Sequence, residues 1–418
     1  MPAGPKKRLL IVATTTGYQL RMFREAAERL GAEVSLATDR CHVLEDPWGD
    51  HAIPVRFEAP EESAAAVAKG RSFDAVVAIG DRPAYLAALT AARFGLPFHR
   101  PEAAAAAVNK FATRECFRKA GLAVPRYCKL QAGENAESAA KEIQYPCVLK
   151  PLALSTSRGV IRANDPREFV RAFTRIGKLL QSPGIARLRD PALDYIQVES
   201  FLPGREFALD GLLTNGRLQV LALFDKPDPL DGPYFQETIY VSPSREPPRV
   251  QEAIRETAQL AVTALGLHQG PVHAEMRVEG GRVWMLEVAP RPIGGLCAKA
   301  LTFEKDMPLE ELIVRHAFGE DVSGVRRRAG AAGVMMIPVP RAGIYQGVRG
   351  LERAQALADE VMITAKTGQR VFPLPEGNTY LGFLFAYGET ASPVEERLRH
   401  AHKSLEFEIA GTLPVMSR

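Results

Sequence analysis

Two glutamates in one hairpin are the first residues of this chain whose spacing points to chemistry. Glu275 lies in "VHAEMRVE" and Glu287 ends the apolar run "VWMLE", with Gly280–Gly281 between them. A two-residue turn at the glycines would put Glu275 opposite Leu286, whereas a three-residue loop through Arg282 would put it opposite Glu287. Facing carboxylates repel each other, and a bound divalent cation would remove that cost. We therefore predict a metal site here, the alternative being two solvated acids on an exposed sheet face.

An arginine follows this hairpin in "EVAPRPIGG". The guanidinium of Arg291 can hold an anion through a planar fork of donors, and Gly294–Gly295 can offer main-chain N–H groups nearby. The chain contains no convincing Ser/His/Asp or Cys/His arrangement that would supply a nucleophile. These residues indicate a reaction in which the protein positions reactants and stabilises charge.

A lysine and a loop of small residues precede the hairpin. Lys150 ends the apolar run "PCVLK", and the following "LALSTSRGV" contains Ser155, Thr156, Ser157 and Gly159. Such a loop lets backbone N–H groups approach phosphate oxygens while a lysine supplies fixed charge. The alternative is an ordinary turn after a strand.

Two more glutamates flank a Pro-Gly turn in "VESFLPGREF". Glu199 and Glu206 could accept hydrogen bonds from an amino group and from ribose hydroxyls. Exposed surface charge is the alternative explanation for either residue.

Alternating strands and helices must position the N-terminal part of such a site. The segments "RLLIVATT", "GYQLRMFREAAERLG", "AEVSLAT", "FDAVVAIG" and "DRPAYLAALTAARFG" predict a small parallel α/β unit over residues 1–105. Its first turn, "ATTTGYQ", lacks the Gly-x-Gly-x-x-Gly pattern, so the unit alone is a poor candidate for binding a dinucleotide.

In the rest of the chain the predicted strands and helices do not alternate regularly. The stretch 101–121, "PEAAAAAVNKFATRECFRKAG", predicts one helix, and "YPCVLKPL" predicts a strand. Several β-type segments follow, with Asn215–Gly216 as a hairpin turn, before the helix "PPRVQEAIRETAQLAVTALG" and the glutamate hairpin. The last hundred residues, with further strands and the helix "SPVEERLRHAHKSL", predict a separate C-terminal α+β domain.

In this order, the segments of residues 1 to about 320 resemble the ATP-grasp superfamily. The resemblance implies a multidomain α/β and α+β protein with a Rossmann-like pre-ATP-grasp domain at 1–105. The lid subdomain would then span 106–190, the subdomain with the metal site 191–320, and the C-terminal α+β domain 321–418.

The resemblance also implies ATP as a cofactor, with Mg²⁺ or Mn²⁺. Lys110, Lys150 and the loop residues Ser155, Thr156, Ser157 and Gly159 would contact the phosphates, Glu199 the adenine and Glu206 the ribose. Glu275 and Glu287 would bind the metal, Arg291 would steady the transferred phosphoryl group, and Lys226 would make a further phosphate contact.

One position departs from the superfamily pattern. Most members read Glu-x-Asn after the second acidic strand, and the asparagine binds metal, but Ala289 stands there in this chain. Water or substrate would take the vacant place, or a second magnesium would bind more weakly. Bacterial L-amino-acid ligases, which form dipeptides, include members that read Glu-x-Ala-x-Arg, as "EVAPR" does, and their extra C-terminal domain is similar to residues 321–418.

The narrower resemblance implies an ADP-forming carboxylate–amine ligase that works through an acyl phosphate and joins amino acids. An ATP-dependent carboxylase and a non-catalytic ATP-binding protein are the alternatives. The chain has no Met-Lys-Met biotin attachment segment, which argues against the carboxylase hypothesis.

Composition restricts the partners. With 53 basic and 49 acidic residues, the net charge of +4 is too balanced for a nucleic-acid-binding protein. No apolar stretch approaches the roughly 20 residues of a membrane helix, and five cysteines without a Cys-x-x-Cys pair suit a reducing compartment. We expect a cytoplasmic enzyme with small-molecule carboxylate and amine substrates and no nucleic-acid or membrane partner. Its oligomeric state stays open, a homodimer being the commonest arrangement.

Overall fold

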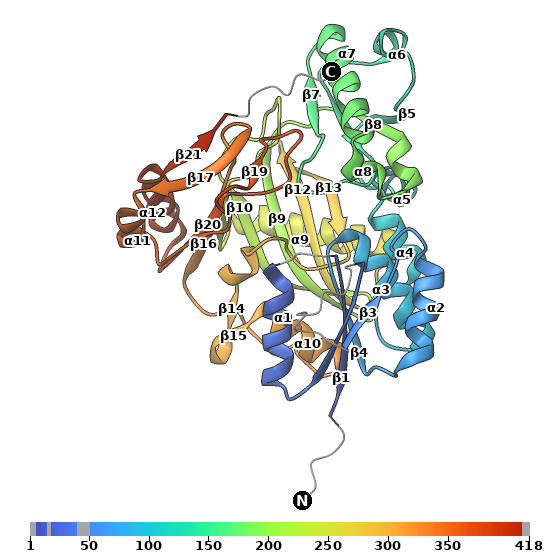
Figure 1. The fold of residues 1–418 in the computed structure, drawn as a ribbon, viewed down its shortest axis with the longest axis vertical. Helices are drawn as coiled ribbons and strands as arrows, with labels where there is room; N and C mark the ends of the chain where they lie inside the picture. Colours follow the sequence, from blue (N-terminus) through green and yellow to red (C-terminus); the bar gives the residue numbers. More distant parts are fainter. Residues whose placement is uncertain (1–5, 15–17, 40–50, 412–418) are drawn as a thin grey trace, which may run out of the picture.

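Parallel strands form the N-terminal unit, as its alternating segments predict. The computed structural model describes residues 6–14, 18–39 and 51–411, so residues 15–17 of the first turn and Cys41 lie outside it. The strand order is β3-β2-β1-β4, with α2 and α3 packed on one face and α1 and α10 on the other (Figure 1). The bounds are β1 Arg8–Ala13, α1 Tyr18–Arg29, β2 Glu33–Thr38, β3 Ala52–Pro54, α2 Pro60–Gly70, β4 Ala75–Ile79, α3 Asp81–Phe94 and α10 Leu309–Ala317.

Two helices replace the single helix predicted over residues 101–121. They are α4 (Pro101–Ala107) and α5 (Lys110–Lys119). The prediction is wrong because Asn109 is extended and its side chain accepts the N–H groups of Phe111 and Ala112, which begins a new helix. The break places Lys110 in the first turn of α5, where its Nζ donates to the Leu154 carbonyl at 2.7 Å.

A four-stranded antiparallel sheet carries the predicted phosphate loop. Its strand order is β5-β8-β6-β7, and the loop connects β6 to β7. Helices α6 and α7 pack on this sheet, and Val148 pairs with Glu199, so that Lys150 and Glu199 are diagonal neighbours on one face. The bounds are β5 Tyr127–Gln131, α6 Ala136–Glu142, β6 Cys147–Pro151, β7 Ile161–Ala163, α7 Pro166–Leu180, α8 Pro183–Ala186 and β8 Tyr195–Ser200.

The largest sheet joins the glutamate hairpin to the C-terminal region. Its order is β13-β12-β9-β10-β11-β16-β20-β18, and Asn215–Gly216 forms the predicted two-residue turn between β9 and β10. Helix α9 covers the β9, β12 and β13 part, and α12 covers the β16 and β20 part. The bounds are β9 Arg205–Thr214, β10 Arg217–Lys226, β11 Ile239–Ser242, α9 Pro248–Leu265, β12 Gly270–Glu279, β13 Arg282–Ala289, β16 Ala331–Ile337, β18 Glu360–Ile363, β20 Gly382–Gly388 and α12 Ala391–Lys403.

Smaller elements complete the chain. A two-stranded sheet precedes α10, and a three-stranded sheet of order β19-β17-β21 lies in the C-terminal region. The bounds are β14 Thr302–Phe303, β15 Met307–Pro308, β17 Gly343–Arg349, α11 Leu351–Leu357, β19 Arg370–Val371 and β21 Glu406–Ala410.

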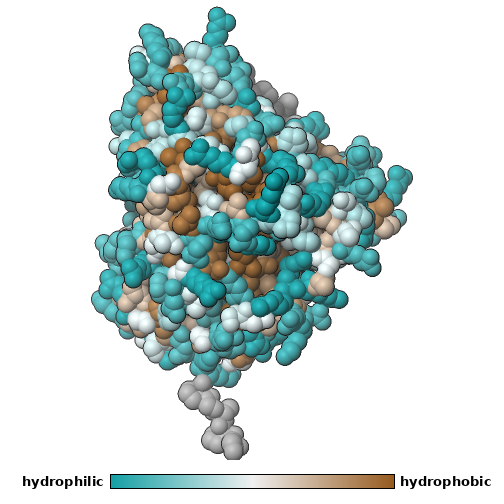
Figure 2. All heavy atoms as spheres, turned by 180° about the vertical axis from the view of Figure 1, so that it is seen from behind, coloured by the Kyte–Doolittle hydropathy of each residue, from teal (hydrophilic) through white to brown (hydrophobic). Residues whose placement is uncertain are grey.

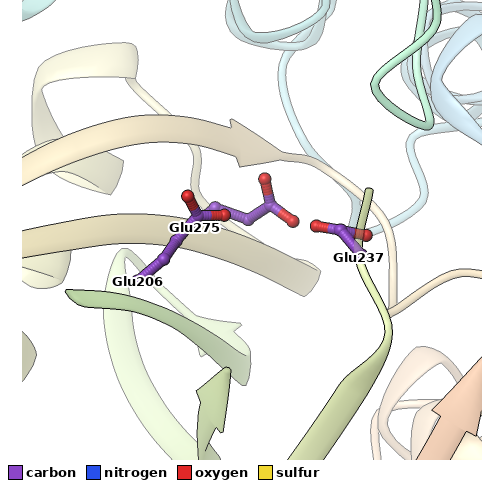
Figure 3. A group of neighbouring side chains, drawn as sticks. All are labelled: Glu206, Glu237 and Glu275. Atoms are coloured by element: carbon purple, nitrogen blue, oxygen red, sulfur yellow. The ribbon is translucent and has the colours of Figure 1, made fainter. Parts of the chain in front are cut away.

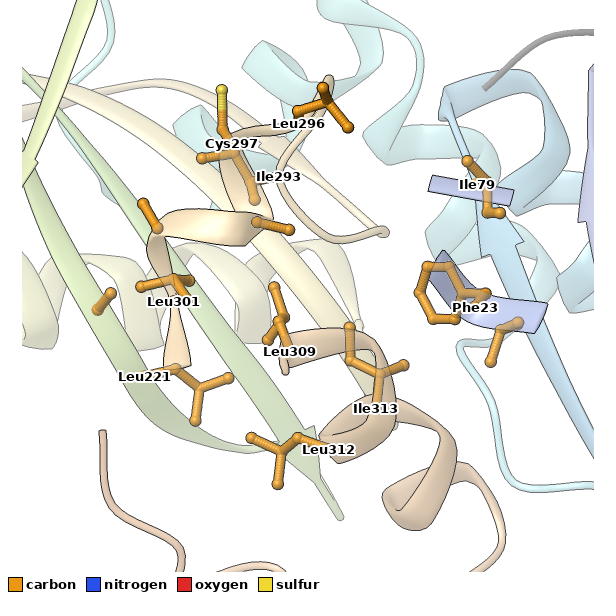
Figure 4. Packing of buried hydrophobic residues seen from close by; sticks show 14 of the residues in the cluster. Phe23, Ile79, Leu221, Ile293, Leu296, Cys297, Leu301, Leu309, Leu312 and Ile313 are labelled. Atoms are coloured by element: carbon orange, nitrogen blue, oxygen red, sulfur yellow. The ribbon is translucent and has the colours of Figure 1, made fainter. Parts of the chain in front are cut away.

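One hydrophobic core fixes the N-terminal unit against the large sheet. Phe23 of α1 and Ile79 of β4 face Leu309 and Ile313 of α10, and Leu221 of β10 lies beyond them (Figure 4). Fully burying a side chain of this kind stabilises the fold by about 1.5–3 kcal/mol. The core therefore holds the carboxyl end of β4 in a fixed position relative to the glutamate hairpin.

The face shown in Figure 2 is predominantly hydrophilic. In Figure 2 hydrophobic atoms gather toward the middle of the face shown, within a hydrophilic rim. Among the described residues, the large hydrophobic side chains that are more than a third exposed are Leu260, Phe372 and Tyr387. None of the described helices combines the length and the apolar character that crossing a membrane requires.

Candidate active site

A β-bulge brings Glu275 opposite Glu287. The strands pair up to a two-residue turn at Gly280–Gly281, so the predicted three-residue loop is wrong. The register then shifts by one residue at Leu286, which is the extra residue of a bulge. A three-residue loop would have shifted the register by the same one residue. The two glutamates therefore face each other, and this prediction is confirmed.

The facing glutamates lie in a cleft that gathers most of the predicted site residues. The space between its walls, open solvent included, is about 1240 Å³. Gly159 and Lys226 lie beside its wall, and Tyr240, Cys297, Met336 and Tyr380 belong to the wall although no sequence pattern indicated them. The predicted residues in the wall are Lys110, Lys150, Ser155, Thr156, Ser157, Glu199, Glu206, Glu275, Glu287 and Arg291.

Three carboxylates surround the buried ammonium of Lys226. Its Nζ lies 2.9 Å from Glu206, 2.5 Å from Glu237 and 2.9 Å from Glu275. Figure 3 shows the Glu237 and Glu275 side chains approaching each other from separate segments. An ammonium has three N–H donors, and all are used here, so the predicted phosphate contact of Lys226 would require this cluster to rearrange.

The ligand type of this cluster suits a divalent cation. Oxygen atoms of Glu206, Glu237 and Glu275 lie within 4.8 Å of one another, and carboxylate oxygens are the ligands that Mg²⁺ prefers. Besides Lys226, the Arg277 Nε lies 3.0 Å from Glu206 and the His273 Nε2 lies 3.6 Å from Glu275, so cations already accompany these carboxylates. Burial raises the pKa of Glu237 to about 7. Glu287 stands outside the cluster, with its carboxylate 3.7 Å from the Lys110 Nζ.

A buried ion-pair cluster fixes Lys150. Glu199 accepts hydrogen bonds from Lys150 at 2.5 Å, from Arg114 at 2.6 and 3.3 Å, and from Gln197 at 2.6 Å. Burial would raise the pKa of Glu199, but Arg114 and Lys150 outweigh burial and hold it at about 2. Four donors use the acceptor capacity of one carboxylate, so the geometry favours a role in positioning Lys150, and the adenine contact of Glu199 stays a prediction.

Two charged partners in the site were missed from the sequence. Arg114 comes one helical turn after Lys110 in α5, a spacing that places both on one side of the helix. Asp81 binds the Arg291 guanidinium at 2.8 and 3.4 Å. Asp81 directly follows Gly80 after β4, and acids at the carboxyl end of a parallel strand are placed where ligands bind, which was the available signal.

Comparison with known families agrees with this geometry. Residues 143–300 match the ATP-grasp domain, and residues 335–410 match the L-amino acid ligase C-terminal domain 2. Residues 143–300 thus form an ATP-grasp domain, and residues 335–410 form a domain of the kind that ends L-amino acid ligases. An L-amino acid ligase structure from Bacillus licheniformis superposes with a TM-score of 0.82 and 25% identity, over 98% of this chain and 100% of that one.

Curated ATP-grasp relatives are matched over part of their length. Alanine–anticapsin ligase from Bacillus subtilis is 27% identical over 202 residues, which are 46% of this chain and 42% of that protein. A formate-dependent phosphoribosylglycinamide formyltransferase from Anaeromyxobacter dehalogenans is 31% identical over 263 residues, which are 61% of this chain and 62% of that protein. The alignments thus span less than two thirds of these two relatives.

A histidine faces Ala289 in this ATP-grasp site. His273 is the register partner of Ala289, and its ring lies 3.3 Å from Asp210 and 3.6 Å from Glu275. Burial would lower the pKa of His273, but these carboxylates raise it to about 9. The ring is therefore charged at neutral pH, so a cation lies beside the position where the resemblance leads one to expect a metal-binding asparagine.

Proposed function

We propose that the protein is an ATP-dependent, ADP-forming ligase that joins a carboxylate to an amine through an acyl phosphate, with amino acids as substrates. The observation that carries the proposal is that one cleft gathers the facing Glu275 and Glu287 with Arg291 and two lysines. ATP and Mg²⁺ or Mn²⁺ are the proposed cofactors. Glu275 and Glu287 would hold the magnesium ion, which would supply positive charge to stabilise the phosphates.

The residues of the chain supply positioning and charge. In the first step a substrate carboxylate oxygen attacks the γ-phosphorus of ATP and ADP leaves. In the second the amine attacks the acyl carbon and phosphate leaves. Lys110 and Lys150 would neutralise phosphate oxygens, and Arg291 would hold the transferred group through its two-pronged donor set. No covalent enzyme intermediate is needed, which suits a site without a paired nucleophile and base.

The wall beside Glu237 supports an amino-acid substrate. Glu237 lies in the cleft next to Tyr240, so its carboxylate can accept hydrogen bonds from a substrate ammonium. Ile293, Cys297 and Met336 form an apolar part of the same wall. We propose that Glu237 binds the amino group and that this apolar wall receives the side chain.

A product screen tests the proposal. The protein is incubated with Mg-ATP and pairs of amino acids, and phosphate release and product mass are measured. We expect ADP, phosphate and a condensed product that depends on both substrates. Formate and bicarbonate belong in the panel as carboxylates, because a formate-using enzyme is among the relatives.

Three outcomes would contradict the proposal. Release of AMP and pyrophosphate would show adenylation instead of phosphorylation. ATP hydrolysis that requires bicarbonate would favour a carboxylase. Tight ATP binding without turnover across the panel would favour a non-catalytic nucleotide-binding protein.

A further inference from the structure

A segment of the C-terminal region, residues 372–380, lies against the predicted phosphate loop, residues 155–159. The Gly159 N–H donates to the Pro375 carbonyl at 2.9 Å, and the Arg158 Nε donates to the Glu376 carbonyl at 2.9 Å. Thr156 and the residues around Leu374 border one small hollow between the two stretches. The phosphate loop is thus held from outside its own sheet.

An ion pair strengthens this contact. The Glu376 carboxylate accepts from Arg175 of α7 at 2.5 and 2.8 Å, and Arg175 also donates to the Tyr234 hydroxyl at 2.5 Å. Helix α7 packs on the sheet that carries the phosphate loop. Glu376 therefore contacts the phosphate loop through its backbone carbonyl and helix α7 through its carboxylate.

The phosphate loop needs such support because its backbone is strained. Thr156 and Ser157 have φ values of 58° and 54°, in the left-handed region that side chains other than glycine rarely adopt. Conformations of this kind persist where surrounding contacts over-determine them. The hydrogen bonds from Arg158 and Gly159 to the C-terminal segment are contacts of this sort.

The same segment also reaches the substrate side of the cleft. Tyr380, four residues after Glu376, lines the cleft together with Glu237 and Met336. One short stretch of the C-terminal region thus contacts both the loop over the phosphates and the wall that receives the amino acid.

We propose that Glu376 is a positioning residue that holds the loop 155–159 over the cleft, so that the C-terminal region completes the nucleotide site. The inference rests on the proposed function in one respect, that ATP occupies this cleft. Glu376→Gln keeps the size of the side chain but removes the charge that pairs with Arg175. Because a half-exposed ion pair is a modest interaction, we expect the Kd and KM for Mg-ATP to rise about three- to fivefold, while kcat changes less than twofold.

A matched control is available in the same region. Glu408 of β21 pairs with Arg349, and its side chain is 41% exposed, compared with 37% for Glu376. Glu408→Gln removes a similar ion pair away from the phosphate loop, so the Kd for Mg-ATP should stay at the wild-type value. Equal thermal melting of the two variants shows that both fold. The inference is overturned if Glu376→Gln and Glu408→Gln bind Mg-ATP equally well.

A double-mutant cycle tests the pairing itself. Arg175→Gln should raise the Kd for Mg-ATP as Glu376→Gln does, and the double variant should be no worse than either single variant. Effects that multiply would contradict the pairing. Exchange of the two charges, Arg175→Glu with Glu376→Arg, should recover part of the affinity.

The design separates this inference from the proposed function. Binding is measured with a fluorescent ATP analogue in the absence of carboxylate and amine, so the positioning role is judged without ligation. If the variant loses affinity but the wild type forms no product, the ligase proposal fails and the positioning role stands. If the wild type forms product and Glu376→Gln behaves as Glu408→Gln does, only the positioning role fails.

Discussion

Arg291 and Asp81 form a two-pronged ion pair across the boundary between the parallel N-terminal sheet and the eight-stranded sheet. Their shorter contact is 2.8 Å, and both side chains are largely buried, at 13% and 18% exposure. Burial would raise the pKa of Asp81, but Arg291 lowers it, so the carboxylate stays ionised. The N-terminal unit thereby sets the direction in which the proposed phosphoryl-binding guanidinium points.

Replacing Asp81 should impair catalysis more than nucleotide binding. In Asp81→Asn the guanidinium loses its fixed orientation, and misplacement of a catalytic group by about 1 Å can cost about 100-fold in rate. We expect kcat for the ligase reaction to fall at least about tenfold, with the Kd for Mg-ATP nearly unchanged. Glu62→Gln, which removes an exposed pair with Arg56 in the same unit, serves as the control. Equal kcat values for the two variants would refute a positioning role for Asp81.

The facing carboxylates should be needed for metal-dependent turnover. Glu287→Gln keeps the shape of the side chain but removes one of two charges that would hold the cation. Activity should fall by more than about 100-fold, by analogy with other lost charge-stabilising groups, while the melting temperature stays within a few degrees. Any residual activity should need a higher Mg²⁺ concentration to reach half of its maximum. A variant with unchanged Mg²⁺ dependence would place the metal elsewhere.

Glu199 should contribute to stability as well as to the site. In Glu199→Gln the buried Arg114, which is 2% exposed, would lose its ionic partner, and breaking a buried pair typically costs about 3–5 kcal/mol. Urea unfolding at pH 7 measures this loss. Glu252→Gln, which removes an exposed pair with Arg255 of α9, should leave the unfolding midpoint unchanged. If both variants unfold at the same urea concentration as the wild type, the cluster is not a structural anchor.

A buried acid outside the cleft should make stability depend on pH. Glu310 is 1% exposed, and among the described residues neither carboxylate oxygen has a hydrogen-bond partner. Burial raises the pKa of Glu310 from 4.5 to about 7. The folded state thus keeps a proton that the unfolded chain releases, so the stability contribution is complete below pH 4.5 and is lost as the pH rises through 7, by up to about 3 kcal/mol.

Glu310→Gln isolates this effect. The variant has no group to titrate, so its melting temperature should exceed that of the wild type at pH 8 and match it more closely at pH 5. A constant difference between variant and wild type over this range would show that Glu310 keeps the same protonation state throughout.

The sequence predicted which residues face each other in the hairpin and which stretches are helical, but it missed the local irregularities within them. The acidic pattern of the hairpin placed Glu275 opposite Glu287, but the loop length was wrong, because a bulge at Leu286 and a longer loop produce the same shift. The alanine-rich stretch 101–121 has the composition of one helix, and only the side-chain bonds of Asn109 divide it.

The missed residues share a cause. Asp81 is 210 positions from Arg291, and Glu376 is 201 positions from Arg175. Periodicity shows which side of an element is buried but not which other element lies against it. These pairings depend on the packing of whole sheets, which no local pattern records.

The eight-stranded sheet has a consequence for how the chain can be divided. The two matched families meet between residues 300 and 335, yet β11 and β16, on either side of that boundary, are hydrogen-bonded neighbours from Ile239 to Ser242. A chain ending near residue 330 would expose the edge of β11 and the apolar side chains that α12 and β20 now cover, and a bare edge of this kind invites pairing with other molecules. The two matched regions therefore share one sheet. We expect truncation near residue 330 to yield aggregates. Exchange of whole C-terminal regions between relatives keeps the sheet complete and should yield soluble hybrids.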